Sequence, residues 1–155
     1  MALIKLLNYA STHTNATLRY VSSDMILHIY SDASYRSEPK LRRRFGGLFT
    51  LTSRTNDTTK PPIVTPTPNG ATDTVSNIMR NVMLSITEAE AVRLFHNTKD
   101  GVMIRITLAK MGHLQLATPI QTDSSNATGT TNGNVKQRKS KAMDMQFYWV
   151  QDRVF

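Results

Sequence analysis

The sequence predicts an α/β fold in which helices pack on one mixed β-sheet. Two runs rich in β-branched and aromatic residues, 25–30 and 45–52, indicate strands. Later in the chain, capping residues at 85–90 and apolar positions at helical spacing indicate helices. A chain of 155 residues is long enough for one domain and too short for two with full cores.

The first half of the chain is predicted to form a short helix and three strands. Apolar residues at helical spacing predict the helix over 3–10. The run 25–30 has almost no polar interruption, so we expect a central strand buried on both faces. The strand 45–52 follows a basic loop, and the short connection favours antiparallel pairing. Residues 74–79 are predicted to form an edge strand, after a loop rich in Thr, Asn and Pro.

The second half is predicted to form three helices and one strand. Residues 85–90 contain two overlapping capping boxes, which predict the start of a helix. A separate helix is predicted from about 101 to 111, because Gly112 suits the position just past a helix C-terminus. The segment 114–122 contains a strand interrupted by a proline. In 142–155, apolar side chains recur at spacings of four, three and four residues, which predicts an amphipathic helix.

Positive charge is in excess along the chain. Lys and Arg number 19 against 11 Asp and Glu, a net charge of +8. This excess indicates a polyanionic partner, nucleic acid above all, and a solvated basic surface is the alternative. The candidate nucleic-acid-binding side chains lie in two basic segments, 36–44 and 136–141. They are Arg42, Arg43, Arg44, Lys136, Arg138, Lys139 and Lys141.

The composition and the motifs also exclude several kinds of protein. Without cysteine there is no disulfide scaffold, cysteine-based zinc site or thiol nucleophile. No apolar run approaches the roughly 20 residues that span a bilayer, and Lys5 interrupts the apolar N-terminus. The four histidines lack metal-ligand spacing, and no glycine-rich phosphate loop is present. We therefore expect an intracellular protein that is neither secreted nor associated with a membrane.

Three carboxylates occupy positions where ligands gather in α/β proteins. Asp32 follows the strand 25–30, Asp123 follows the strand within 114–122, and Glu90 lies in the first turns of a helix. If the two strands are parallel neighbours, the carboxylates of Asp32 and Asp123 converge beyond their carboxyl ends. Such a cluster repels itself unless a cation neutralises it, and Mg²⁺ or Mn²⁺ suits oxygen ligands. Two such ions could assist hydrolysis of a phosphodiester.

Each of these features also has an ordinary structural interpretation. An Asp after a strand is commonly a turn or capping residue, and a Glu early in a helix commonly serves the helix dipole. Glu88 and Glu90 both suit that position, so capping alone does not separate them. Tyr148 and Trp149 could stack on bases, but packing between helices is the more common use of such rings.

Six segments carry short motifs in a defined order. They are Ser-Asp-Ala-Ser-Tyr at 31–35, Arg-Phe-Gly-Gly at 44–47, Asn-Gly-Ala at 69–71, Ser-Ile-Thr-Glu-Ala-Glu at 85–90, Thr-Asp-Ser-Ser-Asn-Ala at 122–127 and Ser-Lys-Ala-Met-Asp at 140–144. In their order and spacing they resemble the ribonuclease H domain of copia-type LTR retrotransposon polyproteins. The resemblance covers nearly the whole chain.

The resemblance implies a ribonuclease H-like mixed β-sheet with flanking helices. It also implies hydrolysis of the RNA strand of an RNA:DNA hybrid, with two divalent ions, Mg²⁺ or Mn²⁺, held by four acids. Asp32 matches the first acid, Glu90 the second and Asp123 the third. Residues 1–22 resemble the connection from a reverse transcriptase domain, so the ribonuclease H-like domain is expected to span 23–155.

The chain departs from the pattern of this family at several positions. Ser124 replaces the usual Asn, Ala91 replaces Tyr, and the sequence ends before a segment that would carry the fourth acid. We therefore expect a domain that lacks its last strand and last helix, with weak or absent hydrolysis. We also expect self-association through an open sheet edge, or contact with an upstream reverse transcriptase domain. The alternatives are a non-catalytic nucleic-acid-binding remnant and an unselected relic of a retroelement.

Overall fold

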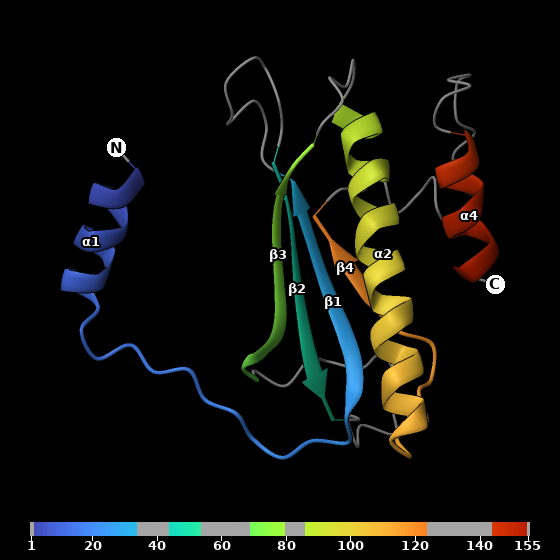
Figure 1. Cartoon of the computed structure of the whole chain (residues 1–155), viewed down its shortest axis with the longest axis horizontal. Helices are drawn as coiled ribbons and strands as arrows, with labels where there is room; N and C mark the ends of the chain where they lie inside the picture. The colour runs from blue at the N-terminus through green and yellow to red at the C-terminus, as the bar shows by residue number, and fades with distance from the viewer. Residues whose placement is uncertain (1, 34–43, 54–68, 80–85, 124–143, 155) are drawn as a thin grey trace.

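The computed structural model describes residues 2–33, 44–53, 69–79, 86–123 and 144–154. In this part of the chain, a four-stranded sheet is covered on one face by a long helix (Figure 1). The elements are α1 (Ala2–Thr12), β1 (Ile26–Ala33), β2 (Arg44–Thr52), β3 (Ala71–Ile78), α2 (Ile86–Lys110), β4 (Ile120–Thr122) and α4 (Asp144–Val154). The predicted α/β class with a mixed sheet and flanking helices is confirmed.

The sheet has the strand order β3-β2-β1-β4. β1 pairs antiparallel with β2 along its whole length, from Ile26 opposite Thr52 to Ala33 opposite Phe45. β3 adds to β2 antiparallel, and β4 lies parallel to β1 on its other side. Both pairings that the sequence suggested are therefore present. Because β1 and β4 run in the same direction, their carboxyl ends lie at one edge of the sheet.

β4 is shorter than the predicted strand segment 114–122, because the residues before Ile120 do not form regular backbone pairs with β1. The side-chain amide of Gln115 substitutes for a backbone partner: its Oε1 accepts from the N–H of Leu27 at 3.0 Å, and its Nε2 donates to the carbonyl of Met25 at 2.8 Å. The N–H of Ile29 then donates to the carbonyl of Pro119. Proline has no N–H to donate in return, and regular pairing begins only at Ile120.

β1 is buried on both faces, as its uninterrupted apolar run predicts. Alternate side chains point to opposite faces of a strand, so Leu27 and Ile29 share one face, and Ile26 and His28 share the other. All four side chains are buried. The cluster beneath α2 consists of Leu27, Ile29, Phe49 and Leu108. Burial of these apolar side chains is the main force that holds the helix on the sheet.

α2 is one continuous helix of 25 residues, and the prediction of two helices divided before residue 101 is wrong. Gly101 weakens helix propensity by about 1 kcal/mol relative to alanine. Its missing side chain, however, allows the helix to lie close to the sheet, because a Cβ at this position would collide with Cδ1 of Ile29. Packing against the strand therefore stabilises the helix through the position where local propensity favours a break.

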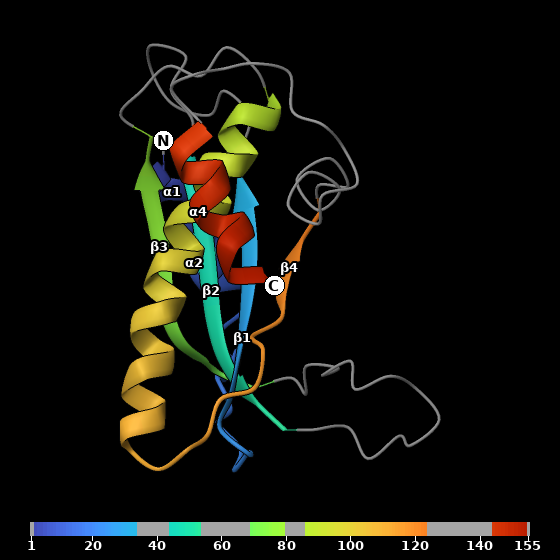
Figure 2. The same cartoon turned by 90° about the vertical axis from the view of Figure 1, so that its right-hand side faces the viewer.

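The helix α4 packs against α2 on the side that faces away from the sheet (Figure 2). The ring of Trp149 meets the ring of Phe95 edge-on, with centroids 5.1 Å apart. The guanidinium of Arg153 lies over the same indole, 3.7 Å from its centroid. Trp149 therefore serves helix packing, the more common of its two interpretations, whereas Tyr148 is exposed.

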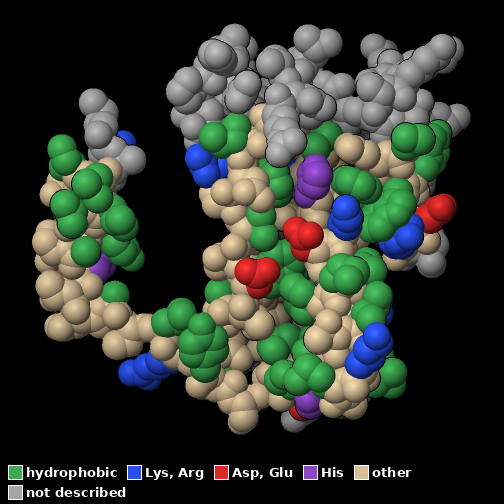
Figure 3. Space-filling model, in the orientation of Figure 1, with side chains coloured by type: hydrophobic (Ala, Val, Ile, Leu, Met, Phe, Trp, Pro, Cys, Tyr) green, Lys and Arg blue, Asp and Glu red, His purple; other side chains and the backbone are tan. Residues whose placement is uncertain are grey.

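The helix α1 stands apart from the sheet, and its hydrophobic side chains are displayed at the surface (Figure 3). The chain that follows it is attached near the start of β3. The side chain of Asn69 bonds both backbone groups of Val21, and the hydroxyl of Tyr20 donates to the carbonyl of Ala71. The domain boundary expected after residue 22 stays a prediction. Among the described residues, no helix is long and apolar enough to span a membrane.

Candidate functional site

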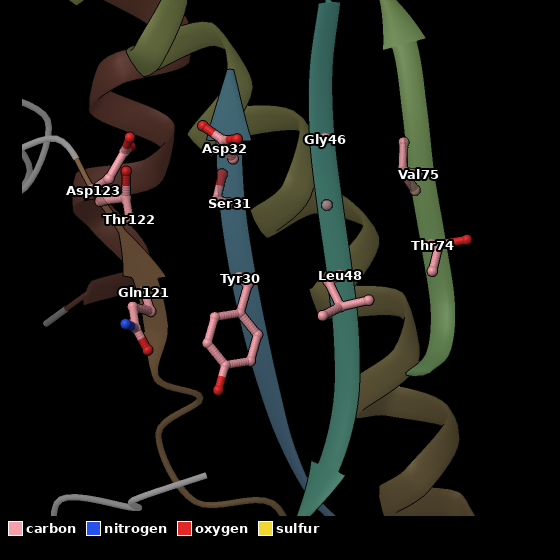
Figure 4. A pocket seen from close by; sticks show the side chains of 11 residues that line it. Tyr30, Ser31, Asp32, Gly46, Leu48, Thr74, Val75, Gln121, Thr122 and Asp123 are labelled. Carbon is pink, nitrogen blue, oxygen red and sulfur yellow. The ribbon is translucent and has the colours of Figure 1, made fainter. Parts of the chain in front are cut away.

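Asp32 and Asp123 lie at neighbouring strand ends. Asp32 is the second-last residue of β1, and Asp123 directly follows β4 (Figure 4). Their side chains are 79% and 77% exposed, respectively. The strands are parallel neighbours, with Ser31 opposite Thr122. These two carboxylates therefore converge at one edge of the sheet. The sequence predicts this convergence if the two strands are parallel neighbours, and they are.

Arg93 of α2 lies between these two carboxylates. One of its guanidinium nitrogens, Nη1, is 3.6 Å from Oδ1 of Asp32 and 3.8 Å from Oδ1 of Asp123. Because both distances share one atom, the two carboxylate oxygens are at most 3.6 + 3.8 = 7.4 Å apart. A cluster of carboxylates repels itself unless a cation neutralises it, and in this structure a positive charge comes from a side chain of the chain itself.

The side chain of Arg93 is only 1% exposed, which is unusual for arginine. Its Nη2 donates a hydrogen bond of 2.5 Å to Oγ1 of Thr122, and its buried Nε has no hydrogen-bond partner among the described residues. Burial lowers the pKa of Arg93, while the charges of Asp123, Glu90 and Asp32 raise it. Arginine keeps its proton in proteins, so the site contains a buried positive charge.

Glu90 lies one helical turn before Arg93, on the same face of α2. It is half-buried, and its charge acts on the guanidinium of Arg93 together with those of the two aspartates. Within the described ranges, no three acidic or histidine side chains lie close enough together to hold one metal ion. Metal binding by Asp32, Glu90 and Asp123 therefore stays a prediction.

Asn97, one turn after Arg93, fixes the helix to the end of β1. Its side-chain amide donates to Oγ of Ser31 at 2.7 Å and to the carbonyl of Gly46 at 3.0 Å. Asn97 is fully buried. A Cβ on Gly47 would lie only 2.5 Å from its Oδ1, which is too close for two atoms that are not bonded. Gly47 in β2 thus makes room for the side chain of Asn97, which holds Ser31, the residue directly before Asp32.

An open hollow of about 520 Å³ lies beside the two aspartates. Figure 4 shows that its lining comes from all four strands, with Tyr30, Leu48 and Gln121 along it and Asp32 and Asp123 at one end. The hollow lies mainly over the sheet face opposite α2, because Tyr30 and Asp32 alternate with the core residues Ile29 and Ser31. An extended ligand lying in it would reach the carboxylates at its end.

Comparison with known proteins identifies the relatives of this fold. The chain is 25% identical over 150 residues to "Retrovirus-related Pol polyprotein from transposon TNT 1-94" of Nicotiana tabacum, an alignment that covers 96% of the chain. The structure is similar to the crystal structure of LC11-RNase H1 in complex with RNA/DNA hybrid, with a TM-score of 0.54 and 14% identity over 82% of this chain and 75% of that one. The chain has a ribonuclease H-like fold and is similar in sequence to a retrovirus-related Pol polyprotein of a transposon.

The resemblance that the motifs predict is thereby confirmed for this ribonuclease H-like domain. No protein-family model matches the chain. The chain spans 10% of the length of the tobacco polyprotein, so the activity and partners of that whole protein belong to the proposals below.

The basic residues of the ribonuclease H-like domain are placed only in part. Arg44 starts β2, and its Nη1 donates to the backbone carbonyl of Ser76 at 3.2 Å and to its hydroxyl at 3.3 Å. The remaining candidate nucleic-acid-binding side chains lie outside the described residues. They are Arg42, Arg43, Lys136, Arg138, Lys139 and Lys141.

Sequence reasoning missed the two α2 residues that organise this site, Arg93 and Asn97. A signal was present, since Glu90, Arg93 and Asn97 recur at three and four residues and so lie on one helical face. The same face continues to Gly101, which contacts the sheet. Polar side chains on the buried face of a helix indicate partners on the sheet, because buried polar groups are costly without them.

Proposed function

We propose that this domain hydrolyses the RNA strand of RNA:DNA hybrids with the help of divalent metal ions. The observation that carries the proposal is the placement of Asp32 and Asp123 at the carboxyl ends of parallel neighbours, with oxygens at most 7.4 Å apart. The relationship to a Pol polyprotein and the fold shared with a ribonuclease H1 bound to an RNA/DNA hybrid support the choice of reaction.

The donor chemistry of the site fits a hard divalent cation. Asp32, Glu90 and Asp123 offer only carboxylate oxygens, which Mg²⁺ and Mn²⁺ prefer. The high exposure of the two aspartates leaves room for water and for a phosphate beside them. When bound, such ions lower the pKa of water and neutralise charge on a phosphodiester. We propose Mg²⁺ or Mn²⁺ as the cofactor on this basis.

The remaining features of the site suit an extended polyanion. The hollow along the strands ends at the carboxylates, so a nucleic acid strand lying in it would present a phosphate there. Recognition of the hybrid would depend on its backbone shape and on 2′-hydroxyl groups. The net charge of +8 would supply attraction to phosphates that does not depend on base sequence.

The test is a cleavage assay on an RNA:DNA hybrid labelled on the RNA strand, with Mg²⁺, Mn²⁺ or EDTA. Asp32→Asn should remove metal-dependent cleavage, because a neutral amide is a poorer ligand for a divalent ion. Asp24→Asn is the matched control, since Asp24 precedes the opposite end of the same strand. Equal cleavage by the wild type and Asp32→Asn would exclude Asp32 from the reaction.

A second candidate function is binding of the hybrid without hydrolysis. The observation that favours it is the buried positive charge of Arg93 between Asp32 and Asp123. In this case the domain would bind the hybrid in EDTA without any need for Mg²⁺, with affinity falling steeply as salt rises, and would leave the RNA intact. Fluorescence anisotropy in EDTA at several salt concentrations, beside the cleavage assay, separates the two functions.

A further inference from the structure

We propose that Arg93 is a built-in cation of the carboxylate site, which takes the place of a divalent ion and weakens the binding of one. The proposal rests on the proposed function, because it takes Asp32, Glu90 and Asp123 as the metal-binding carboxylates. The proposal is that the positive charge of Arg93 lowers the affinity for the metal ion, and it assigns Arg93 no part in the hydrolysis step.

The position of Arg93 is fixed by the fold. Its side chain is 1% exposed, and its Nη2 is bonded to Thr122 in the strand that leads to Asp123. Its Nη1 lies at nearly equal distances from the two aspartates, 3.6 and 3.8 Å. A surface arginine could swing into water to admit an ion, but this guanidinium is enclosed by α2 and the strand ends.

The charges at the site explain the competition. Arg93 carries one positive charge against the three carboxylates, and its Nη1 lies within ion-pair distance of two of them. A divalent ion held by both aspartates would lie beside the guanidinium and would be repelled by it, because Nη1 of Arg93 is 3.6 and 3.8 Å from the two carboxylates and like charges so close repel one another even where water reaches them. To remove that repulsion, Arg93 would have to leave its hydrogen bond with Thr122.

The same charge has a reciprocal effect on stability. With Arg93 in place, the aspartates are partly neutralised, so the fold does not need a metal ion to relieve their repulsion. Without the charge, the carboxylates would repel one another, and an ion that binds them would stabilise the folded state. A divalent ion should therefore stabilise a variant without the charge more than it stabilises the wild type.

The experiment measures Mn²⁺ binding by isothermal titration calorimetry, and the melting temperature with and without Mn²⁺. Arg93→Met and Arg93→Gln remove the charge in two ways, and Arg93→Lys retains it. Arg105→Met is the matched control, because Arg105 lies on the same helix and bonds the carbonyl of Gln115, away from the carboxylates. Neither readout requires catalytic activity.

We expect the two neutral variants to bind Mn²⁺ about tenfold or more tightly than the wild type. Their melting temperatures should be lower without metal and should rise more on its addition, while Arg93→Lys and Arg105→Met should bind Mn²⁺ as the wild type does. Adding Asp32→Asn to Arg93→Met should abolish the gain. If Arg93→Met does not fold, Arg93→Gln, which retains polar groups near Thr122, provides the same comparison.

Two results would overturn the inference, and they differ in what they say of the proposed function. Equal Mn²⁺ affinity in the wild type and the neutral variants, with loss of binding in Asp32→Asn, would leave the metal site intact and remove the role of Arg93. Absence of Mn²⁺ binding in every variant would overturn both the inference and the metal-dependent reaction.

Discussion

The side-chain amide of Asn97 donates a hydrogen bond of 2.7 Å to the hydroxyl of Ser31, and this bond joins α2 to β1 at the residue before Asp32. The same amide reaches the carbonyl of Gly46 in β2. One buried side chain thus connects a helix with two strands beside the carboxylates.

Replacement of Asn97 by alanine should lower the free energy of unfolding by about 1–3 kcal/mol, because the buried partners Ser31 and Gly46 lose their donor. Urea unfolding followed by circular dichroism measures the change. Asn77→Ala is the control, since Asn77 is exposed on β3. Equal stability of Asn97→Ala and the wild type would show that these hydrogen bonds contribute nothing.

The two adjacent glycines of β2 should differ sharply in their tolerance of alanine. A Cβ on Gly47 would lie 2.5 Å from Oδ1 of Asn97 and 3.2 Å from the ring of Phe49, and both of these side chains are fully buried. We expect Gly47→Ala to cost about 1–3 kcal/mol in the free energy of unfolding. A Cβ on Gly46 meets nothing closer than 3.7 Å, so Gly46→Ala should change stability by about 0.5 kcal/mol or less. Chemical denaturation of both variants tests the contrast, which would be refuted by equal losses.

The stability of the domain should fall as the pH drops below about 6.5. Burial lowers the pKa of His28 from its usual value of 6.5, and burial likewise lowers that of His96, where Asp100 opposes the shift. The histidines of the unfolded chain therefore take up protons at a higher pH than those of the folded chain. The free energy of unfolding is highest above the histidine pKa of the unfolded chain, and it decreases as the pH falls toward the lower pKa of the folded chain. The urea concentrations at the midpoint of unfolding, measured between pH 7.5 and 5, give this decrease of stability with pH.

Replacement of His28 should make that pH profile flatter. His28→Gln removes a buried histidine, whereas His13→Gln removes an exposed one at the end of α1 and serves as the control. A profile of His28→Gln that runs parallel to that of the wild type would show that His28 does not cause the acid sensitivity.

The contact between α4 and α2 should depend on Trp149 and not on its neighbour. Trp149→Ala removes the ring that meets Phe95 and Arg153, and we expect a loss of about 2 kcal/mol, less than for a fully buried tryptophan because Trp149 is half-buried. Tyr148→Ala, at an exposed position on the same helix, should leave stability nearly unchanged. Thermal melts of the two variants would contradict this prediction if their losses were equal.

The elements with a strong local signal could be predicted from the sequence. The strand runs at 25–30 and 45–52 correspond to β1 and β2, and the amphipathic pattern at 142–155 corresponds to α4. The start of the edge strand is predicted less well, since the sequence favours 74–79 and β3 spans Ala71–Ile78. For β1, β2 and α4, the pattern of apolar residues along the segment is itself the signal, so little information from elsewhere in the chain is needed.

Features that depend on distant partners could not be predicted in the same way. Local propensity favours a break at Gly101, and only its contact with Ile29 shows why the helix continues. Arg93 is of a type that normally lies at the surface, and its burial depends on Asp32 and Asp123, which are far from it in sequence. The convergence of the carboxylates could be foreseen because strand direction alone determines it, but the charge between them could not.

The uninterrupted course of α2 sets a strict limit on how its length can change. Gly101 rests on the middle of β1 while Arg93 reaches the end of the same strand, and the helix turns about 100° with each residue. One inserted or deleted residue between these positions would therefore rotate the guanidinium out of line with the aspartates, or lift the glycine from its strand. Homologous chains that retain both contacts should differ by substitution between residues 93 and 101, and their insertions and deletions should fall elsewhere.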